Sequence, residues 1–200
     1  MGRKKDKLVY GVGVNDADYA VTGYVMRDGR RKQTLCPIYA KWKDMLKRCY
    51  CEKAIKRRPT YTECYVCDSW LYFSNFRDWV ISQKDKDWKE KHLDKDILYA
   101  GNKEYSPETC VFVSFSLNML DTGFNDKDGS LRGASFCNTY KKYKSRCNCP
   151  VTGKRVSLGY YETELEAHLA WKAYKHKIAL SLAELETDER VSNRLKLMYK

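Results

Sequence analysis

Residues 132–182 constrain the fold of this chain most strongly, because charge is sharply segregated along them. Residues 132–158 contain seven basic residues and no acidic one, and acidic residues return together at Glu162, Glu164 and Glu166. Positive charge should therefore lie on the first part of the stretch and negative charge where the second part begins. A basic surface is what contact with phosphate groups requires, since each lysine or arginine releases a condensed counterion on docking.

Three short strands are predicted here from the alternation of apolar and polar residues. Side chains alternate across a strand, so every second residue shares a face. The face expected to point inward carries Ala134, Phe136, Tyr143, Ser145, Cys147, Val156, Leu158 and Tyr160. The opposite face then carries serine, cysteine, asparagine, lysine and arginine.

A helix is predicted to follow the third strand. Thr163-Glu164-Leu165-Glu166 matches a capping box, in which the threonine hydroxyl and the second glutamate each satisfy a free backbone N–H. Apolar residues then recur at helical spacing: Ala167, Ala170, Trp171, Tyr174 and Ile178. This stripe needs a cover, which the apolar sheet face supplies, so we expect a three-stranded antiparallel sheet packed on one helix.

These residues resemble the APETALA-two/ethylene-response-factor domain. The likeness rests on Arg132-Gly133-Ala134-Ser135, Tyr143-Lys144, residues 153–163, Glu166-Ala167 and Ala170-Trp171. It implies that the sheet lies in the major groove of double-stranded DNA. The implied contact positions are Arg132, Ser135, Cys137, Lys142, Arg146, Asn148, Arg155 and Ser157. Lys144, on the same basic strand face as Arg146 and Asn148, is expected to bind DNA as well. Several are not the family's usual arginine or tryptophan, so DNA binding carries over and the sequence preference does not. The alternative is a solvated basic face on a domain of other purpose.

The nine cysteines favour thiols over a structural zinc site. Their number is odd and no export signal is apparent, so disulfides are not expected. Cys64 and Cys67 have the spacing of a zinc knuckle, but a good second pair is missing. Cys147 and Cys149 share the inward face of a strand and should belong to the core.

The first part of the chain predicts two amphipathic helices joined by a basic loop. Pro37 opens the first helix, whose apolar side carries Tyr39, Trp42, Leu46 and Cys49. The basic loop contains Lys53, Lys56, Arg57 and Arg58, and Pro59 ends it. The second helix is marked by Phe73, Phe76, Trp79 and Val80. Residues 82–91 are highly charged and predict an exposed helix end or loop.

Residues 92–98 predict a strand that carries acidic side chains. On a pleat His92, Asp94 and Asp96 would share one face. Two carboxylates on one face could hold Mg²⁺ or Mn²⁺, and a nearby imidazole could take the proton of an attacking water. Residues 109–113 predict a second strand, and Ser114 can cap a short helix. The alternative is that both aspartates are exposed strand acids paired with lysine.

Residues 36–120 resemble HNH-type proteins of tailed phages. The likeness rests on Trp42, Met45, Arg48-Cys49-Tyr50, Tyr61, Cys64, Val66-Cys67, Trp70, Phe73, Phe76, residues 93–96, Gly101-Asn102, residues 105–110 and Asn118. It implies a ββα-metal fold that cuts or nicks DNA, and phage homing endonucleases often carry an APETALA-two-type domain behind it. The implied site comprises Asp94 and Asp96 as metal ligands, His92 or Lys95 serving the attacking water, and Asn118 orienting a ligand or the phosphate.

Two departures from that family put the activity in doubt. Lys95 stands where the family has its general-base histidine, and Thr109 stands where it has its middle asparagine, whereas Asn118 is kept. A lysine flanked by two aspartates is a poor base, because negative neighbours favour its charged form. His92 could act as a displaced base, the aspartates could suffice with a metal, or the site could be inactive.

The whole chain therefore predicts an α+β protein of two domains. We expect an HNH-like domain over residues 1–120, a linker over 121–131, an APETALA-two-like domain over 132–184 and a charged tail over 185–200, with a further helix around Val191, Leu195 and Met198. The formal net charge of +12 favours nucleic acid as partner. No apolar run long enough to span a membrane and no signal peptide are apparent, so we expect no membrane partner and an intracellular location. The phage likeness implies bacterial cytoplasm during infection. We expect no small-molecule cofactor.

The function predicted from these features is a metal-dependent DNA endonuclease of homing or nicking type. The basic loop at Lys56, Arg57 and Arg58 would grip the DNA backbone. The alternative is a catalytically inactive DNA-binding regulator or inhibitor on a degenerate HNH fold. RNA binding is a third hypothesis from charge and aromatic content, but no module for reading single strands is apparent.

Overall fold

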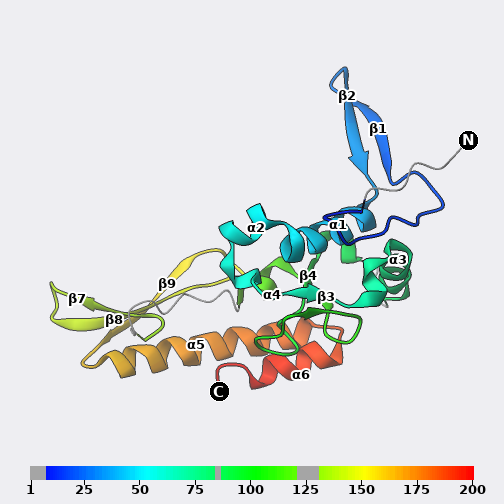
Figure 1. Cartoon of the computed structure of the whole chain (residues 1–200). Coiled ribbons are helices and arrows are strands. Elements are labelled where there is room, and N and C mark those ends of the chain that lie inside the picture. The colour runs from blue at the N-terminus through cyan, green and yellow to red at the C-terminus, as the bar shows by residue number, and fades with distance from the viewer. Residues whose placement is uncertain (1–7, 84–86, 121–130) are drawn as a thin grey trace, which may run out of the picture. The chain divides into compact units, whose positions relative to one another are not determined.

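The computed structural model describes residues 8–83, 87–120 and 131–200, and its mixture of helices and strands confirms the α+β class (Figure 1). The chain divides into two compact units, Met1–Phe112 and Val113–Lys200. The sequence predicts the end of the first domain at residue 120, but the first unit ends earlier, at Phe112. The reason is that the short helix α4 (Phe115–Leu120) contacts helix α5 (Glu164–Leu185) of the second unit. Nearly all of the predicted linker, residues 121–130, lies outside the described residues.

The first unit contains a β-hairpin that the sequence analysis did not predict. Strands β1 (Thr22–Arg27) and β2 (Arg30–Leu35) pair antiparallel, with Arg27 opposite Arg30. Asp28 and Gly29 connect them with φ of 52° and 70°. Two positive φ angles in a two-residue loop fit a type I′ turn, for which Asp-Gly is a preferred pair.

Two helices form the core of the first unit, as the apolar spacing predicts. Helices α1 (Pro37–Tyr50) and α3 (Phe73–Ser82) pack against each other through buried aromatic and aliphatic side chains. Trp42 is fully buried, and its indole N–H donates to the carbonyl of Trp70 at 2.7 Å. The ring centroids of Trp42 and Phe73 lie 5.5 Å apart, so the two predicted stripes meet directly. The buried residues include all four predicted for the first helix, namely Tyr39, Trp42, Leu46 and Cys49.

The predicted basic loop is wrong, because most of it is the helix α2 (Glu52–Arg57). Its sequence lacks glycine and proline and consists largely of good helix formers, which explains the difference. Pro59 cannot continue an α-helix and begins the 3-10 helix η1 (Pro59–Tyr61). The exposed helix end or loop predicted over residues 82–91 is partly wrong, although α3 does end at Ser82. A 3-10 helix, η3 (Asp87–Glu90), buries Trp88 in the core, and its charged neighbours conceal this in the sequence.

Two small sheets complete the first unit. Strand β3 (Tyr65–Val66), followed by the 3-10 helix η2 (Asp68–Leu71), pairs parallel with β5 (Glu104–Tyr105). Strand β4 (His92–Asp94) pairs with β6 (Val111–Val113). The strands predicted over 92–98 and 109–113 are therefore real but shorter. Ser114 caps α4 as predicted, since its Oγ accepts the N–H of Leu117 at 3.2 Å.

The second unit is a three-stranded antiparallel sheet covered by a long helix, as predicted. The strands are β7 (Ala134–Cys137), β8 (Lys142–Asn148) and β9 (Arg155–Tyr161), with β8 in the middle. The α5 helix contacts all three. The predicted capping box is confirmed, because the side chains of Thr163 and Glu166 each accept the other residue's backbone N–H.

The predicted charged tail is wrong, because residues 185–200 belong to the folded unit. Helix α6 (Glu189–Leu197) packs on α5 and buries Val191 and Leu195 completely. The hydroxyl of Ser192 also donates to the carbonyl of Ala183 at 2.9 Å. The further helix expected around these residues is confirmed, and its apolar side supplies cover for α5.

A β-bulge reverses the predicted orientation of the last part of β9. Ser145 pairs with Gly159 and Arg146 pairs with Ser157, so Leu158 is an extra residue between them. One extra residue shifts the alternation by one position, which turns Tyr160 to the outer face opposite Lys144. The predicted inward position of Tyr160 is therefore wrong.

The predicted burial of Phe136 is also wrong. Phe136 pairs with Tyr143, an inward position, and their ring centroids lie 5.2 Å apart. Its side chain is nevertheless 52% exposed. The alternation of a strand assigns a face, but burial also requires a covering element at that point.

Candidate functional site

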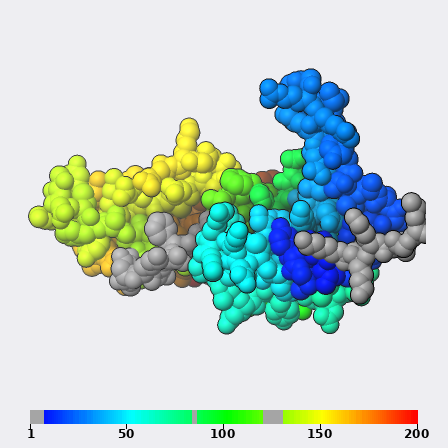
Figure 2. Space-filling model, turned by 45° about the horizontal axis from the view of Figure 1, so that its top comes forward, coloured from blue at the N-terminus to red at the C-terminus, as the bar shows by residue number. Residues whose placement is uncertain are grey.

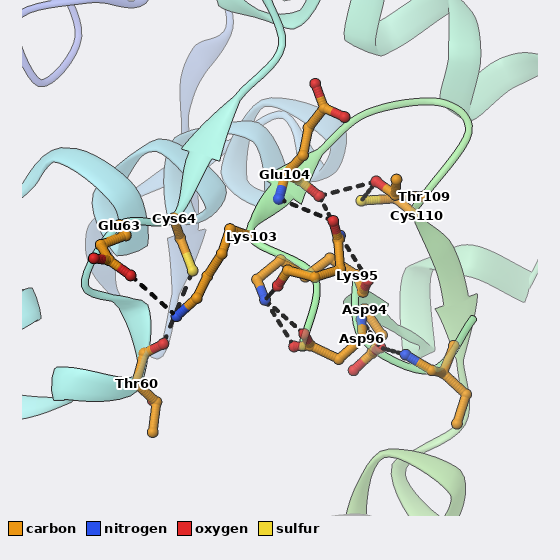
Figure 3. A network of polar contacts seen from close by, with 12 residues as sticks. Thr60, Glu63, Cys64, Asp94, Lys95, Asp96, Lys103, Glu104, Thr109 and Cys110 are labelled. Carbon is orange, nitrogen blue, oxygen red and sulfur yellow. Dashed lines mark hydrogen bonds and ion pairs between the residues drawn. The ribbon is translucent and has the colours of Figure 1, made fainter. Parts of the chain in front are cut away.

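Lys95 lies at the centre of the polar contacts in the acidic segment of the first unit. Lys95 is only 4% exposed, and its ammonium donates to both carboxylate oxygens of Asp96 at 2.7 and 2.9 Å (Figure 3). It also donates to the carbonyl of Asn102. A charge this deeply buried needs such partners, because losing water without replacement is costly.

Asp94 ends strand β4, because its side chain forms a turn with the backbone of the residues that follow. Its Oδ1 accepts the N–H of Asp96 at 2.8 Å and that of Ile97 at 2.7 Å. Aspartate commonly bonds the backbone two or three residues ahead in this way, which competes with strand pairing. Asp96 consequently lies beyond the strand, and the prediction that His92, Asp94 and Asp96 share one pleated face is wrong.

Thr109 and Asn102 tie the following loop together. The side-chain amide of Asn102 donates to the carbonyls of Lys95 and Glu104, at 2.9 and 2.6 Å. The hydroxyl of Thr109 donates to the same Glu104 carbonyl at 2.9 Å (Figure 3). It also accepts the N–H of Ser106 at 3.1 Å. Thr109 therefore holds this loop in place. The sequence analysis missed the role of Asn102, although the Gly-Asn turn pointed to it.

Both carboxylates of this segment already have partners within the chain. Burial raises the pKa of Asp96, although the hydrogen bond and charge of Lys95 act to lower it. A cation on Asp96 would lie beside the Lys95 ammonium, and Asp94 Oδ1 is already engaged by two N–H groups. Within residues 8–83, 87–120 and 131–200 no cluster of three or more His, Cys, Asp or Glu side chains has metal-binding geometry.

His92 occupies a different setting from the two aspartates. It lines a pocket of about 320 Å³ together with charged residues of α1 and η3, among them Lys41, Asp44, Arg48 and Glu90. Arg48 and Asp44 form an ion pair there at 2.6 Å. Burial lowers the pKa of Lys41, whose ammonium donates to the carbonyl of Lys91 at 2.5 Å.

Asn118 and the basic group of α2 stay predictions. Asn118 lies on α4 in the second unit, where its backbone N–H donates to the carbonyl of Ser114 at 2.9 Å. Lys56 and Arg57 lie on α2 and Arg58 directly follows it, all in the first unit. Their predicted parts in binding DNA or phosphate rest on the sequence.

The outer face of the second unit's sheet brings most of the predicted DNA-contact residues together. We call this the basic sheet face, and its members are Ser135, Cys137, Lys142, Lys144, Arg146, Asn148, Arg155, Ser157 and Tyr160. Arg146 donates to Ser135 Oγ at 3.4 Å, and Arg155 Nε donates to Asn148 Oδ1 at 3.2 Å. These bonds orient two guanidinium groups on one surface.

Arg132 and Lys142 lie at the margins of this face. Arg132 precedes β7, and its carbonyl oxygen lies 2.9 Å from Nδ1 of His168. Lys142 forms an ion pair with Glu162 at 2.6 Å. Glu162 therefore competes with any phosphate for this lysine.

The sequence analysis missed an aromatic component of the basic sheet face. The rings of Tyr140 and Tyr160 lie 4.8 Å apart, and the ammonium of Lys144 lies 5.4 Å from the Tyr160 ring centroid. Both tyrosines are exposed. Gly159 was the available signal, because a lone glycine inside a strand pattern often marks a bulge, and its φ is +121°.

The nine cysteines all lie within the described residues and form no disulfide there, as expected, and they include Cys64 and Cys67 with their knuckle-like spacing. Cys64 is buried and Cys67 is half-buried beside the hydroxyl of Ser69. Cys147 and Cys149 are buried as the strand pattern predicts, and burial raises the pKa of Cys147. They serve as small apolar core residues.

Comparison with known proteins adds no family assignment. No protein-family model matches the chain, and neither a curated protein nor a solved structure is significantly similar to it. Among the helices of the described residues, none combines the length and apolarity needed to cross a membrane.

Proposed function

We propose that this chain binds double-stranded DNA through the basic sheet face of its second unit. The observation that carries the proposal is that Lys144, Arg146 and Arg155 lie on one side of the sheet while α5 covers the other. Such a surface offers cations to phosphates on both sides of a groove, with polar and aromatic groups between them. The implied location, bacterial cytoplasm during phage infection, is part of the same proposal.

Two features favour a binding surface over a merely solvated one. Side chains on a solvated face need no fixed orientation, whereas Arg146 and Arg155 are each held by a neighbouring side chain. A guanidinium held in this way loses less freedom when it binds phosphate or a base edge in two places. The positions also coincide with those that the APETALA-two resemblance implies.

The test is equilibrium binding of labelled duplex DNA at several salt concentrations. We expect Arg146→Ala/Arg155→Ala to lower affinity and to reduce the slope of log K against log salt by about two, since each phosphate contact contributes about 0.9. The matched control is Lys177→Ala/Lys196→Ala, which removes two exposed cations from helices α5 and α6. Equal effects of the two double variants would refute the proposal.

For the first unit, the geometry favours the inactive, regulatory alternative over the endonuclease. Lys95 is bound to Asp96, Asp94 holds a turn and Thr109 holds a loop. Each of these roles is structural, and the two carboxylates do not fit a shared cation. We therefore infer a DNA-binding protein on a degenerate HNH-like fold, acting as a regulator or inhibitor.

The endonuclease is the second candidate, favoured by the order of elements β4, β6 and α4 and by the position of His92 on a charged pocket. A strand-cleavage assay with Mg²⁺, Mn²⁺ or EDTA on a denaturing gel separates the two. We expect no cuts on phage or host DNA while duplex binding is retained. Metal-dependent cuts that disappear in His92→Ala, or in Asp94→Ala/Asp96→Ala variants that still bind DNA, would reinstate the endonuclease.

A further inference from the structure

The β1–β2 hairpin is a basic arm that stands apart from the core of its unit. Every residue of both strands is exposed, and the arm projects from the rest of its unit in Figure 2. Its base is anchored, because the N–H of Cys36 donates to the carbonyl of Val21 at 2.8 Å and Val21 is buried. A two-stranded hairpin without a packed face is only marginally stable in water, so this arm gains from a binding partner.

The strand register separates the hairpin into two different faces. Val25 pairs with Lys32 and Arg27 pairs with Arg30, and paired residues project to the same side. We call this side the hairpin basic face. Neither strand contains an acidic residue. Asp28 in the turn lies 4.0 Å from Lys32, and an ion pair this exposed and long contributes little.

The opposite face of the hairpin is organised differently. It carries Tyr24, Met26, Arg31, Gln33 and Leu35. The guanidinium of Arg31 lies 3.9 Å from the ring centroid of Tyr24, so this arginine is stacked on its own face. The cations available to an external partner therefore gather on the hairpin basic face.

We propose that this hairpin is a second DNA-binding element, which lays its basic face into the major groove of the duplex. The groove is about 12 Å wide and admits a two-stranded ribbon, whose strands lie about 4.8 Å apart. Arg27 and Arg30 lie beside the tight Asp28-Gly29 turn at the tip of the arm, which would enter the groove first. The inference rests on the proposed function in naming duplex DNA as partner, but it uses no residue of the sheet.

The test compares two charge-matched double variants of the full chain. Arg27→Gln/Arg30→Gln removes two cations from the hairpin, and Lys43→Gln/Lys47→Gln removes two exposed cations from α1 of the same unit. Each lowers the formal net charge of +12 by two. Binding to a labelled mixed-sequence duplex of several helical turns is measured by anisotropy across a salt series, with circular dichroism checking the fold.

We expect the hairpin variant to reduce the salt slope by about two and the α1 variant to leave it nearly unchanged. Near 0.1 M salt each lost phosphate contact lowers affinity by up to roughly eightfold, so the hairpin variant should bind about ten- to sixtyfold more weakly. Equal slopes and affinities for the two variants would overturn the proposal. So would a hairpin-dependent affinity for anionic phospholipid vesicles or single-stranded RNA that exceeds that for the duplex.

Failure of the two proposals is distinguishable with the sheet variant Arg146→Ala/Arg155→Ala. If that variant binds normally while the hairpin variant is impaired, the sheet proposal fails and the hairpin inference stands. If the sheet variant alone is impaired, the hairpin inference fails. A wild-type chain that binds no duplex at low salt would overturn both.

Discussion

Gly133 lies where a side chain would collide with the core of the second unit. Its φ is +78°, and a Cβ added there would lie 2.1 Å from Trp171 Cγ and 2.3 Å from Cδ1. Trp171 has little freedom to retreat, because its ring stacks on His168 and meets the ring of Tyr199 edge-on. Gly133→Ala must therefore displace either the tryptophan or the start of β7.

The magnitude follows from comparison with Gly153, which has a similar φ of +68° but no atom within 4 Å of an added Cβ. A left-handed conformation costs alanine about 1–2 kcal/mol at either position. The reduced entropy of the unfolded chain offsets about 0.4–1 kcal/mol of this in both variants. Overpacking adds about 1–3 kcal/mol at Gly133 alone. We expect Gly133→Ala to be less stable than Gly153→Ala by about that last amount.

Urea unfolding of the full chain, combined with amide hydrogen exchange, checks this prediction. Exchange resolves the two units separately, which matters because a chain of two units need not unfold in one step. The loss should appear in peptides from β7, β8 and α5 and be absent from those of α1 and α3. Equal destabilisation by the two substitutions would refute the argument, because the contact with Trp171 would then carry no energy.

Two further predictions concern the first unit. Asp16 accepts the N–H and hydroxyl of Ser74 at 2.8 and 2.5 Å near the start of α3, so Asp16→Ala should cost about 0.5–2 kcal/mol in urea unfolding at pH 7. Burial raises the pKa of Asp16, but the hydrogen bonds from Ser74 outweigh burial and hold this pKa below its ordinary value of 3.8. The stabilisation is therefore fully present above pH 3.8 and is lost as the pH falls through the folded-state pKa. Thermal melts of wild type and Asp16→Ala should converge at that low pH. Lys95→Met should lower the free energy of unfolding by about 1–3 kcal/mol, because Asp96 and the Asn102 carbonyl lose their donor. The control Lys103→Met removes an exposed ion pair and should cost less than about 1 kcal/mol. Similar melting temperatures for both variants would contradict a structural role for Lys95.

The local elements of this fold were predictable because short-range chemistry determines them. Helical spacing of apolar residues located α1, α3 and α5, and the Thr163–Glu166 capping box located the start of α5. The alternation on β8 correctly assigned Arg146 and Asn148 to the outer face. Each signal lies within a few residues of the element that it predicts.

Elements with ambiguous local signals were missed or misassigned. The run of charges in the α2 helix suggests a loop, although its residues are largely good helix formers. The β1–β2 hairpin has no buried face, so it lacks the apolar alternation by which strands are usually recognised. Its Asp28-Gly29 turn is the strong local signal for this hairpin.

The candidate sites depended on tertiary structure in different ways. Charge segregation in the sequence was enough to predict a basic sheet face, since a sheet keeps alternate residues together. It could not predict that a bulge at Leu158 would bring Tyr160 to that face, because a shift in strand register is settled by the pairing of β8 with β9.

The acidic segment shows the limit most clearly. The sequence placed Asp94, Lys95 and Asp96 side by side but did not determine their partners. The fold buries the Lys95 ammonium and brings the Asn102 carbonyl to it, so Asp96 becomes the counterion of a buried cation. Whether a carboxylate holds a metal, a turn or an ammonium depends on its desolvation and on the groups that the chain folds against it, which only the tertiary structure decides.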